Sequence, residues 1–177
     1  NLPTKEVYGL FTDNDKRKSA YFIVTKNGVI GTGKLKQTSA TVADGGSNVI
    51  VLRYADVLLM LAECYAEKDN VSKSNEYLNL IKKRAGIEEV SIGDVTLIKE
   101  EIALERRKEL VNEGHRWFDL IRTGKAVEVM NAYFTRTPGY TGITISELNY
   151  VQPIPQGQID TDSATKPVSY THLTLPT

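Results

Sequence analysis

The stretch from Arg53 to Arg84 decides the fold: RYADVLLMLAECYAEKDNVSKSNEYLNLIKKR. From about Val51 its apolar residues recur at helical spacing, which predicts a helix that continues to the polar break at residues 68–70. One stripe of this helix holds Leu52, Ala55, Leu59, Ala62 and Ala66, and a neighbouring stripe holds Leu58, Leu61 and Tyr65. A helix that is apolar over so wide an arc must pack on more than one side.

A second helix is expected from about Ser72 to Arg84, with Gly86 as the residue that follows its end. Its inward-facing residues are Tyr77, Leu78 and Ile81. The small residues Ala62 and Ser74, twelve positions apart, resemble those of a tetratricopeptide helix pair. Only one such pair is visible, and a single repeat cannot bury its own face. We therefore expect further repeats upstream or another kind of partner surface.

A short β-hairpin is predicted before this helix pair. The β-branched and aromatic run 21–25 is followed by Asn27-Gly28 and then by Val29-Ile30. Asn-Gly between two such runs favours a type I′ turn, which needs positive φ at both central residues. Gly31, Gly33, Gly45 and Gly46 then indicate loop.

Two more helices and a long irregular region are predicted after the pair. A third helix is expected from about Asp94, whose carboxylate suits an N-cap, to about Asn112, and a short one from His115 to Thr123. Residues 135–160 are punctuated by Pro and Gly, and the Pro residues of 151–155 require extended backbone there. The expected fold class is mainly α, with a tetratricopeptide-like helix pair, further helices, a short β-hairpin and long irregular loops.

Composition excludes several classes of function. The 177 residues suffice for one domain with a core, and Lys plus Arg equals Asp plus Glu at 22 each. With zero net charge and no basic run, we expect no nucleic-acid partner. The single cysteine, Cys64, excludes an intramolecular disulfide and is interpreted as a small core hydrophobe within its apolar helix. No apolar stretch of 18 or more residues is present.

The third helix carries the only charged cluster worth weighing. Ile98, Ile102, Glu105, Glu109 and Asn112 share one stripe, so two carboxylates continue an apolar face. A glycosidase pair must flank the scissile bond from opposite sides, whereas carboxylates one turn apart on one helix point the same way. We therefore interpret them as structural, paired where helices meet. The candidate partners are Arg106, Arg107 and Arg116.

The remaining candidate residues give no catalytic or metal site. His115 with Glu113 and Asp119 forms no recognised zinc signature, so we expect the histidine to orient a helix junction. Trp117 and Phe118 are interpreted as core residues. The glycines of 28–33 belong to the hairpin and a loop rather than to a phosphate-binding loop, and no serine or cysteine nucleophile motif is present. We predict no catalytic residue, no metal and no cofactor.

Four sequence blocks occur in an order that resembles the C-terminal region of the SusD/RagB family. They are RYADVLLMLAECY from Arg53, YLNLIKKRAG from Tyr77, ERRKELVNEGHRWFDLIRTG from Glu105 and QPIPQGQID from Gln152. The block from Glu105 is the most specific of them, and the segment at 15–17 before a short strand also resembles the family. The resemblance covers about residues 10–162, whereas family members are much longer.

The resemblance implies a mostly helical binding protein that is not an enzyme. Family members are lipid-anchored on the outward face of the outer membrane, where they capture oligosaccharides or other nutrients for a SusC-like TonB-dependent transporter. We expect residues 1–166 to be the C-terminal region of such a protein, a fragment whose N-terminal lipid anchor lies upstream. Residues 167–177 resemble translated sequencing-adaptor read-through and are expected to be a non-native tail.

The sequence leaves the ligand and its contacts open. None of the matched blocks is a glycan-contact motif, so the ligand-binding residues are unknown. Tyr133 and Tyr140 lie in a predicted exposed loop where their rings can stack on sugars, although exposed tyrosines are common in any protein. Two alternatives to nutrient capture are a tetratricopeptide-type scaffold for protein partners and a glycoside hydrolase that uses Glu105 and Glu109.

Overall fold

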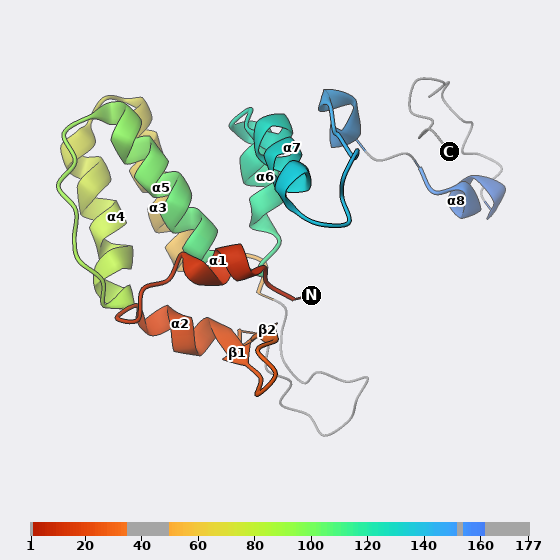
Figure 1. The fold of residues 1–177 in the computed structure, drawn as a ribbon. Helices are drawn as coiled ribbons and strands as arrows, with labels where there is room; N and C mark the ends of the chain where they lie inside the picture. Colours follow the sequence, from red (N-terminus) through yellow and green to blue (C-terminus); the bar gives the residue numbers. More distant parts are fainter. Residues whose placement is uncertain (1, 35–49, 152–153, 162–177) are drawn as a thin grey trace. The chain divides into compact units, whose positions relative to one another are not determined.

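The computed structural model describes residues 2–34, 50–151 and 154–161, and the chain forms two compact units, Asn1–Arg116 and Trp117–Thr177 (Figure 1). Each unit is described by itself. The expected non-native tail, 167–177, and the predicted extended residues 152 and 153 lie outside the described residues. The described part is mostly helical with one two-stranded sheet, as the sequence predicts.

Three helices enclose the main apolar core of the first unit: α3 (Tyr54–Glu67), α4 (Val71–Ala85) and α5 (Val95–Glu109). The predicted αα-hairpin is the α3–α4 pair, and α5 packs against both of its helices. The core consists of Ala55, Leu58, Leu59, Ala62, Ala66, Leu78, Ile81, Ile98 and Ile102. The predicted small positions of the pair meet directly, because the Ser74 hydroxyl donates a hydrogen bond to the Ala62 carbonyl at 2.8 Å.

The ends of these helices follow local capping chemistry. Asp94 caps α5, since its carboxylate accepts a hydrogen bond from the Leu97 N–H at 2.9 Å. Gly86 ends α4 in the left-handed conformation, with φ of 75°, as predicted. Two predicted ends need correction: α3 begins at Tyr54 instead of Val51, and α5 ends at Glu109 instead of Asn112.

Two asparagines on α4 hold the connection to α5. The Asn75 side chain donates to the Ile92 carbonyl and accepts from the Ile92 N–H, at 2.8 and 3.0 Å. Asn79 makes the same pair of hydrogen bonds with Val90, both at 2.8 Å. The segment between α4 and α5 therefore lies along α4 at Val90 and Ile92, whose backbone N–H and C=O groups are satisfied by the asparagine side chains.

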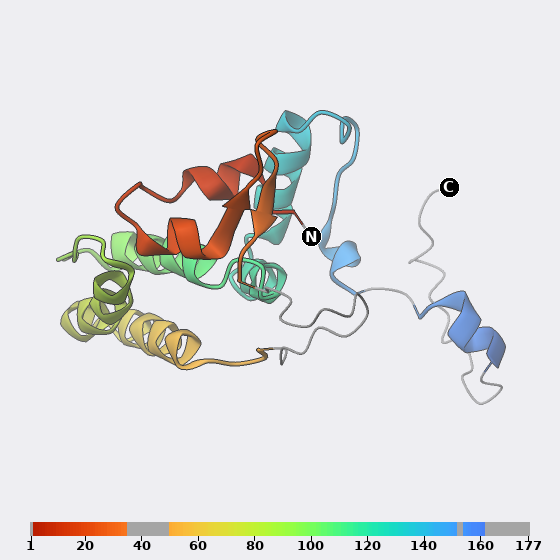
Figure 2. The ribbon, with the colours of Figure 1, turned by 90° about the horizontal axis from the view of Figure 1, so that it is seen from below.

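The N-terminal part of the first unit holds α1 (Lys5–Gly9), α2 (Lys16–Tyr21), β1 (Phe22–Val24) and β2 (Ile30–Thr32). Figure 2 shows this part on one side of α5 and the α3–α4 pair on the other. It has its own small core of Phe11, Phe22 and Ile30. The two short helices were not predicted, since segments of 5 and 6 residues are too short to show a helical period.

The predicted hairpin is present, but its turn differs from the expected type. Strands β1 and β2 pair antiparallel, with Ile23 opposite Gly31. Gly28 has φ of 74°, whereas Asn27 is not among the residues with positive φ, so a type I′ turn is wrong. Thr25 accepts from the Gly28 N–H and donates its own N–H to Val29, both at 2.9 Å. This is the three-residue loop that closes with a left-handed glycine.

The second unit holds most of α6 (His115–Arg122), together with α7 (Ala126–Arg136), the 3₁₀ turn η1 (Glu147–Tyr150) and α8 (Gln156–Thr161). Helix α7 was not predicted, and the placement of Tyr133 in a loop is wrong because it lies within α7. The predicted loop 135–160 is interrupted by η1 and α8. Trp117 packs edge-on against Tyr150 at 6.0 Å between ring centroids.

Three predicted core residues lie at the surface instead. Leu52 precedes α3 and is 72% exposed, and Phe118 is 69% exposed. Cys64 lies on the outer face of α3 and is exposed, so its interpretation as a core hydrophobe is wrong. Among the residues that the structure describes, none of the helices combines the length and apolar character needed to cross a bilayer.

Candidate functional site

The charged stripe of α5 lies in a buried ionic junction between α5 and the N-terminal part of the chain. At its centre, Arg17 of α2 donates to Glu105 at 2.5 Å and to Glu109 at 2.9 Å. The same guanidinium binds Asp15 through Nε and Nη2, at 2.9 and 2.8 Å. The side chains of Arg17, Asp15, Glu105 and Glu109 are each no more than 4% exposed. One arginine therefore joins three buried carboxylates.

A second part of the junction gathers around Glu113. Arg53, which precedes α3, donates from Nε to one Glu113 oxygen at 2.7 Å, and Lys34, which follows β2, donates to the other at 2.5 Å. Both cations also bind the backbone carbonyl of Glu109. Because α5 ends at Glu109, this carbonyl belongs to the last helical turn, where cations are favoured. Through these bonds Glu113 holds the segment after β2, at Lys34, and the segment before α3, at Arg53.

Glu109 connects the two parts. Its Oε1 accepts from Arg53 and Arg84 at 2.5 Å each, and from the Tyr21 hydroxyl at 3.2 Å. Burial alone raises the pKa of the Glu109 carboxyl, but the hydrogen bond and charge of Arg53 and the charge of Arg84 outweigh it and hold the pKa below its usual value. The group therefore stays ionised in its buried position.

Burial and pairing compete at the other titratable groups too. For Asp15 and Glu113, burial raises the pKa, but bonds from Arg17 and Arg53, respectively, leave it below its usual value. For Lys34, burial dominates over the charge of Glu113 and lowers the pKa to about 8. The Lys34 ammonium also lies 3.9 Å from the centroid of the Tyr21 ring.

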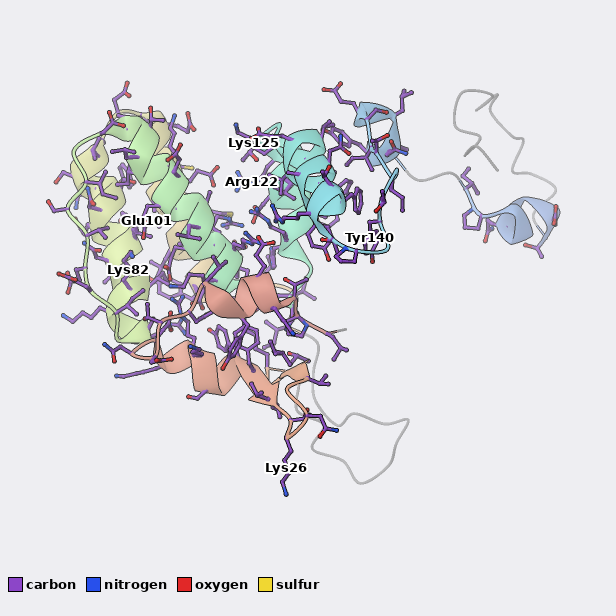
Figure 3. All side chains as sticks on the ribbon, viewed as in Figure 1. Lys26, Lys82, Glu101, Arg122, Lys125 and Tyr140 are labelled. Carbon is purple, nitrogen blue, oxygen red and sulfur yellow. The ribbon has the colours of Figure 1, made fainter. Side chains whose placement is uncertain are left out.

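The prediction that Glu105 and Glu109 are buried and ion-paired is confirmed, but the predicted partners missed most of the junction. Its cations are Arg17, Lys34, Arg53, Arg84 and Lys108. Arg106 pairs with buried Asp56 of α3 at 2.8 Å, and Arg107 pairs with Glu6 of α1 at 2.8 Å. A separate pair, Lys82 of α4 with Glu101 of α5, closes the α4–α5 contact at 2.5 Å (Figure 3).

Arg17, Lys34 and Arg53 were missed because each lies 56 or more residues in the sequence from the carboxylates that it binds among Glu105, Glu109 and Glu113. A helical period reports neighbours one turn apart and carries no information on such pairs. The only available signal was that two carboxylates on an apolar stripe require cations from somewhere, since unpaired buried charge is costly.

The junction is poorly suited to acid/base chemistry. A general acid or base must reach a proton on the substrate, and both carboxylates are at most 1% exposed. Their oxygens already accept hydrogen bonds from arginine. A glycosidase acid also needs a raised pKa, whereas the pKa of Glu109 is lowered. The geometry favours a structural junction.

The other predicted candidates are not brought together into a metal site. Glu113 is engaged by Arg53 and Lys34, and Asp119 is paired with Arg122 at 2.9 Å. His115 is the first residue of α6, next to the break between α5 and α6. That it orients the two helices stays a prediction. Within the described ranges, no three side chains of His, Cys, Asp or Glu gather as metal ligands.

The match to a known family covers almost all of this architecture. The model of the SusD family matches residues 5–166, which include the helix pair, the ionic junction and the second unit up to α8. The chain belongs to the SusD family. The resemblance inferred from the four sequence blocks is thereby confirmed.

Relatives within the SusD family agree in sequence and in fold. The SusD-like protein P38 of Formosa agariphila is 39% identical over 93 residues, which is 48% of this chain and 18% of that protein. Surface glycan-binding protein A from Bacteroides uniformis has a TM-score of 0.73 and 25% identity, over 92% of this chain and 40% of that one.

A further solved structure contains a bound sugar. It is surface glycan-binding protein A from Bacteroides thetaiotaomicron in complex with laminarihexaose, with a TM-score of 0.70 and 28% identity over 90% of this chain and 39% of that chain. This SusD-family chain thus spans less than half the length of these relatives, and their activity describes proteins of greater length.

Proposed function

We propose that the protein is a non-catalytic, cell-surface binder of glycans or similar nutrients that hands its ligand to a partner TonB-dependent transporter in the outer membrane. The family match over residues 5–166 carries the proposal. The likeness to surface glycan-binding proteins supports the ligand class, since one of them holds laminarihexaose. The transporter, the outward-facing location and the lipid anchor are expectations from the family resemblance.

Glycan binding is tested by titrating the chain with hexasaccharides in a calorimeter. The panel contains laminarihexaose, maltohexaose, cellohexaose and xylohexaose, and affinity gels with the corresponding polysaccharides detect weaker binding. We expect one member to bind in preference to the others. If no member of the panel and no polysaccharide gel retains the chain, the proposed function is wrong for these residues.

Transporter partnership needs a different measurement, in cells of the source organism. A tagged protein that carries this chain should be cleaved by protease added outside intact cells, and it should co-purify with a TonB-dependent transporter. Protection from external protease, together with recovery of other protein classes alone, would contradict the proposal.

The glycoside hydrolase alternative depends on Glu105 and Glu109. Because both carboxylates are buried and bound by arginine, we expect any hydrolysis by the chain to be unchanged in Glu105→Gln. Loss of hydrolysis in a Glu105→Gln variant that remains folded would revive this alternative. The scaffold alternative has less support, because the family model that matches residues 5–166 is that of the SusD family.

A further inference from the structure

An aromatic cluster in the second unit has features of a ligand platform rather than of a core. It joins Tyr133 and Phe134 of α7 with Tyr140 of the following loop. The rings of Phe134 and Tyr140 are stacked, with centroids 5.4 Å apart and an interplanar angle of 19°. Tyr133 lies 6.0 Å from Tyr140 and 5.9 Å from Phe134. Tyr140, which is labelled in Figure 3, is nevertheless an exposed residue, with 41% of its surface accessible to solvent.

The loop that carries Tyr140 is fixed by its own hydrogen bonds. The Tyr140 N–H donates to the Thr137 carbonyl at 3.2 Å, and the Tyr140 carbonyl accepts from Ile143 at 3.0 Å. The Asn131 amide of α7 donates to the Ile145 carbonyl and accepts from the Ile145 N–H, at 3.0 and 2.8 Å. These bonds tie the loop back to its own helix.

Two glycines set the backbone on either side of the ring. Gly139 has φ of 91° and Gly142 has φ of 86°, values that side-chain-bearing residues rarely adopt. Tyr140 is therefore presented by a backbone with defined turns. A ring held in place before binding loses little conformational freedom when a ligand arrives, which favours affinity.

The charge beside the aromatic cluster and the small number of its rings indicate which kind of ligand it can bind. The Arg136 guanidinium lies 5.8 Å from the Tyr133 ring centroid and occupies the cation–π position there, so its positive charge disfavours a cationic ligand. Three rings are also far fewer than the roughly 20–30 residues that each side of a specific protein interface contributes. A pyranose ring fits better, because its C–H face packs on an electron-rich aromatic face while its hydroxyls stay hydrated.

We propose that Tyr140, supported by Phe134 and Tyr133, is a surface platform on which one pyranose ring of a glycan stacks. This inference rests on the proposed function and adds a location to it. The phenol keeps its hydroxyl at the ring edge, where it can donate to a sugar oxygen. The platform contributes a contact to an uncharged sugar and no chemical step.

The test compares four variants in calorimetric titrations with the hexasaccharide that binds the unmodified chain. Tyr140→Ala removes the ring, Tyr140→Leu keeps apolar bulk without it, and Tyr140→Phe keeps the ring without the hydroxyl. Tyr54→Ala is the matched control, since Tyr54 is a 73% exposed tyrosine of the first unit. Circular dichroism checks the fold of each variant.

We expect Tyr140→Ala and Tyr140→Leu to lose about tenfold or more in affinity, and Tyr140→Phe and Tyr54→Ala to stay within about twofold to threefold. If Tyr140→Ala is not folded, Tyr140→Leu decides the question. Unchanged affinity in the folded Ala or Leu variant overturns the platform and leaves glycan binding in place. Failure of the unmodified chain to bind any probe overturns both proposals.

Discussion

Helix α5 takes part in two interiors of opposite chemistry along one face. Its first half contributes Ile98 and Ile102 to the apolar core with α3 and α4, and its second half contributes Glu105 and Glu109 to the ionic junction with α2. Apolar neighbours are interchangeable within volume limits, whereas each buried carboxylate needs a particular cation in a particular place. The core therefore depends on pattern, and the junction depends on the identity of individual residues.

The largest effect is expected from removing the central cation of the junction. Arg17→Met leaves Asp15 and Glu105 buried with fewer cations, and should lower the free energy of unfolding by about 3–5 kcal/mol. Urea denaturation measures the loss. Arg107→Met is the matched control, because its ion pair with Glu6 is partly exposed and should contribute no more than about 1 kcal/mol. Equal losses in the two variants would contradict a special role for Arg17.

The stability contributed by the apolar core of α3, α4 and α5 should depend on side-chain volume rather than on residue identity. Leu59 is fully buried, so Leu59→Ala should cost about 2–5 kcal/mol, whereas Leu59→Met, which conserves volume, should cost less than about 1.5 kcal/mol. Thermal and urea unfolding of the two variants give the comparison. The corresponding conservative change in the junction, Arg17→Lys, should be tolerated less well than Leu59→Met, since lysine cannot reproduce the fork that binds Asp15. If Arg17→Lys lost less stability than Leu59→Met, the ionic junction would not depend on residue identity more than the apolar core does, which would contradict the distinction between the two interiors.

A smaller effect is expected from pH. The pKa of Lys34 is lowered to about 8 from a usual value of 10.5, so above pH 8 the unfolded chain binds more protons at this residue than the folded chain. The Lys34 contribution to the free energy of unfolding should therefore rise between pH 8 and pH 10. Above that range Tyr21, whose pKa is raised by burial, acts in the opposite direction. Lys34→Met should abolish the rise, and an identical pH profile in the variant would show that Lys34 does not cause it.

The features that could be predicted from the sequence are local ones, whereas the long-range ion pairs of the junction could not be predicted. The α3–α4 pair, Gly86 and the Asp94 cap were predictable because helical spacing and capping are local properties. The burial of Glu105 and Glu109 was predictable from their place on an apolar stripe. Their cations were not, since Arg17 comes from 88 and 92 residues away. Only tertiary structure brings such residues together.

Surface positions were harder to predict than buried ones. Cys64 and Phe118 are apolar members of helical patterns, yet both are exposed. A pattern shows which residues share a helical face, and it does not show whether another element covers that face. The reverse holds for Tyr140, whose exposure was expected but whose stacking on Phe134 depends on the path of the loop.

The most direct test of the account is a double-mutant cycle between Arg17 and Glu105, measured by urea unfolding of Arg17→Met, Glu105→Met and the double variant. If the two side chains form a buried pair across α2 and α5, the double variant should lose less than the sum of the single losses, with a coupling energy of about 1–3 kcal/mol. Single losses that add to within about 0.5 kcal/mol would mean that the residues act independently, and would contradict the ionic junction as the element that joins the N-terminal part to α5.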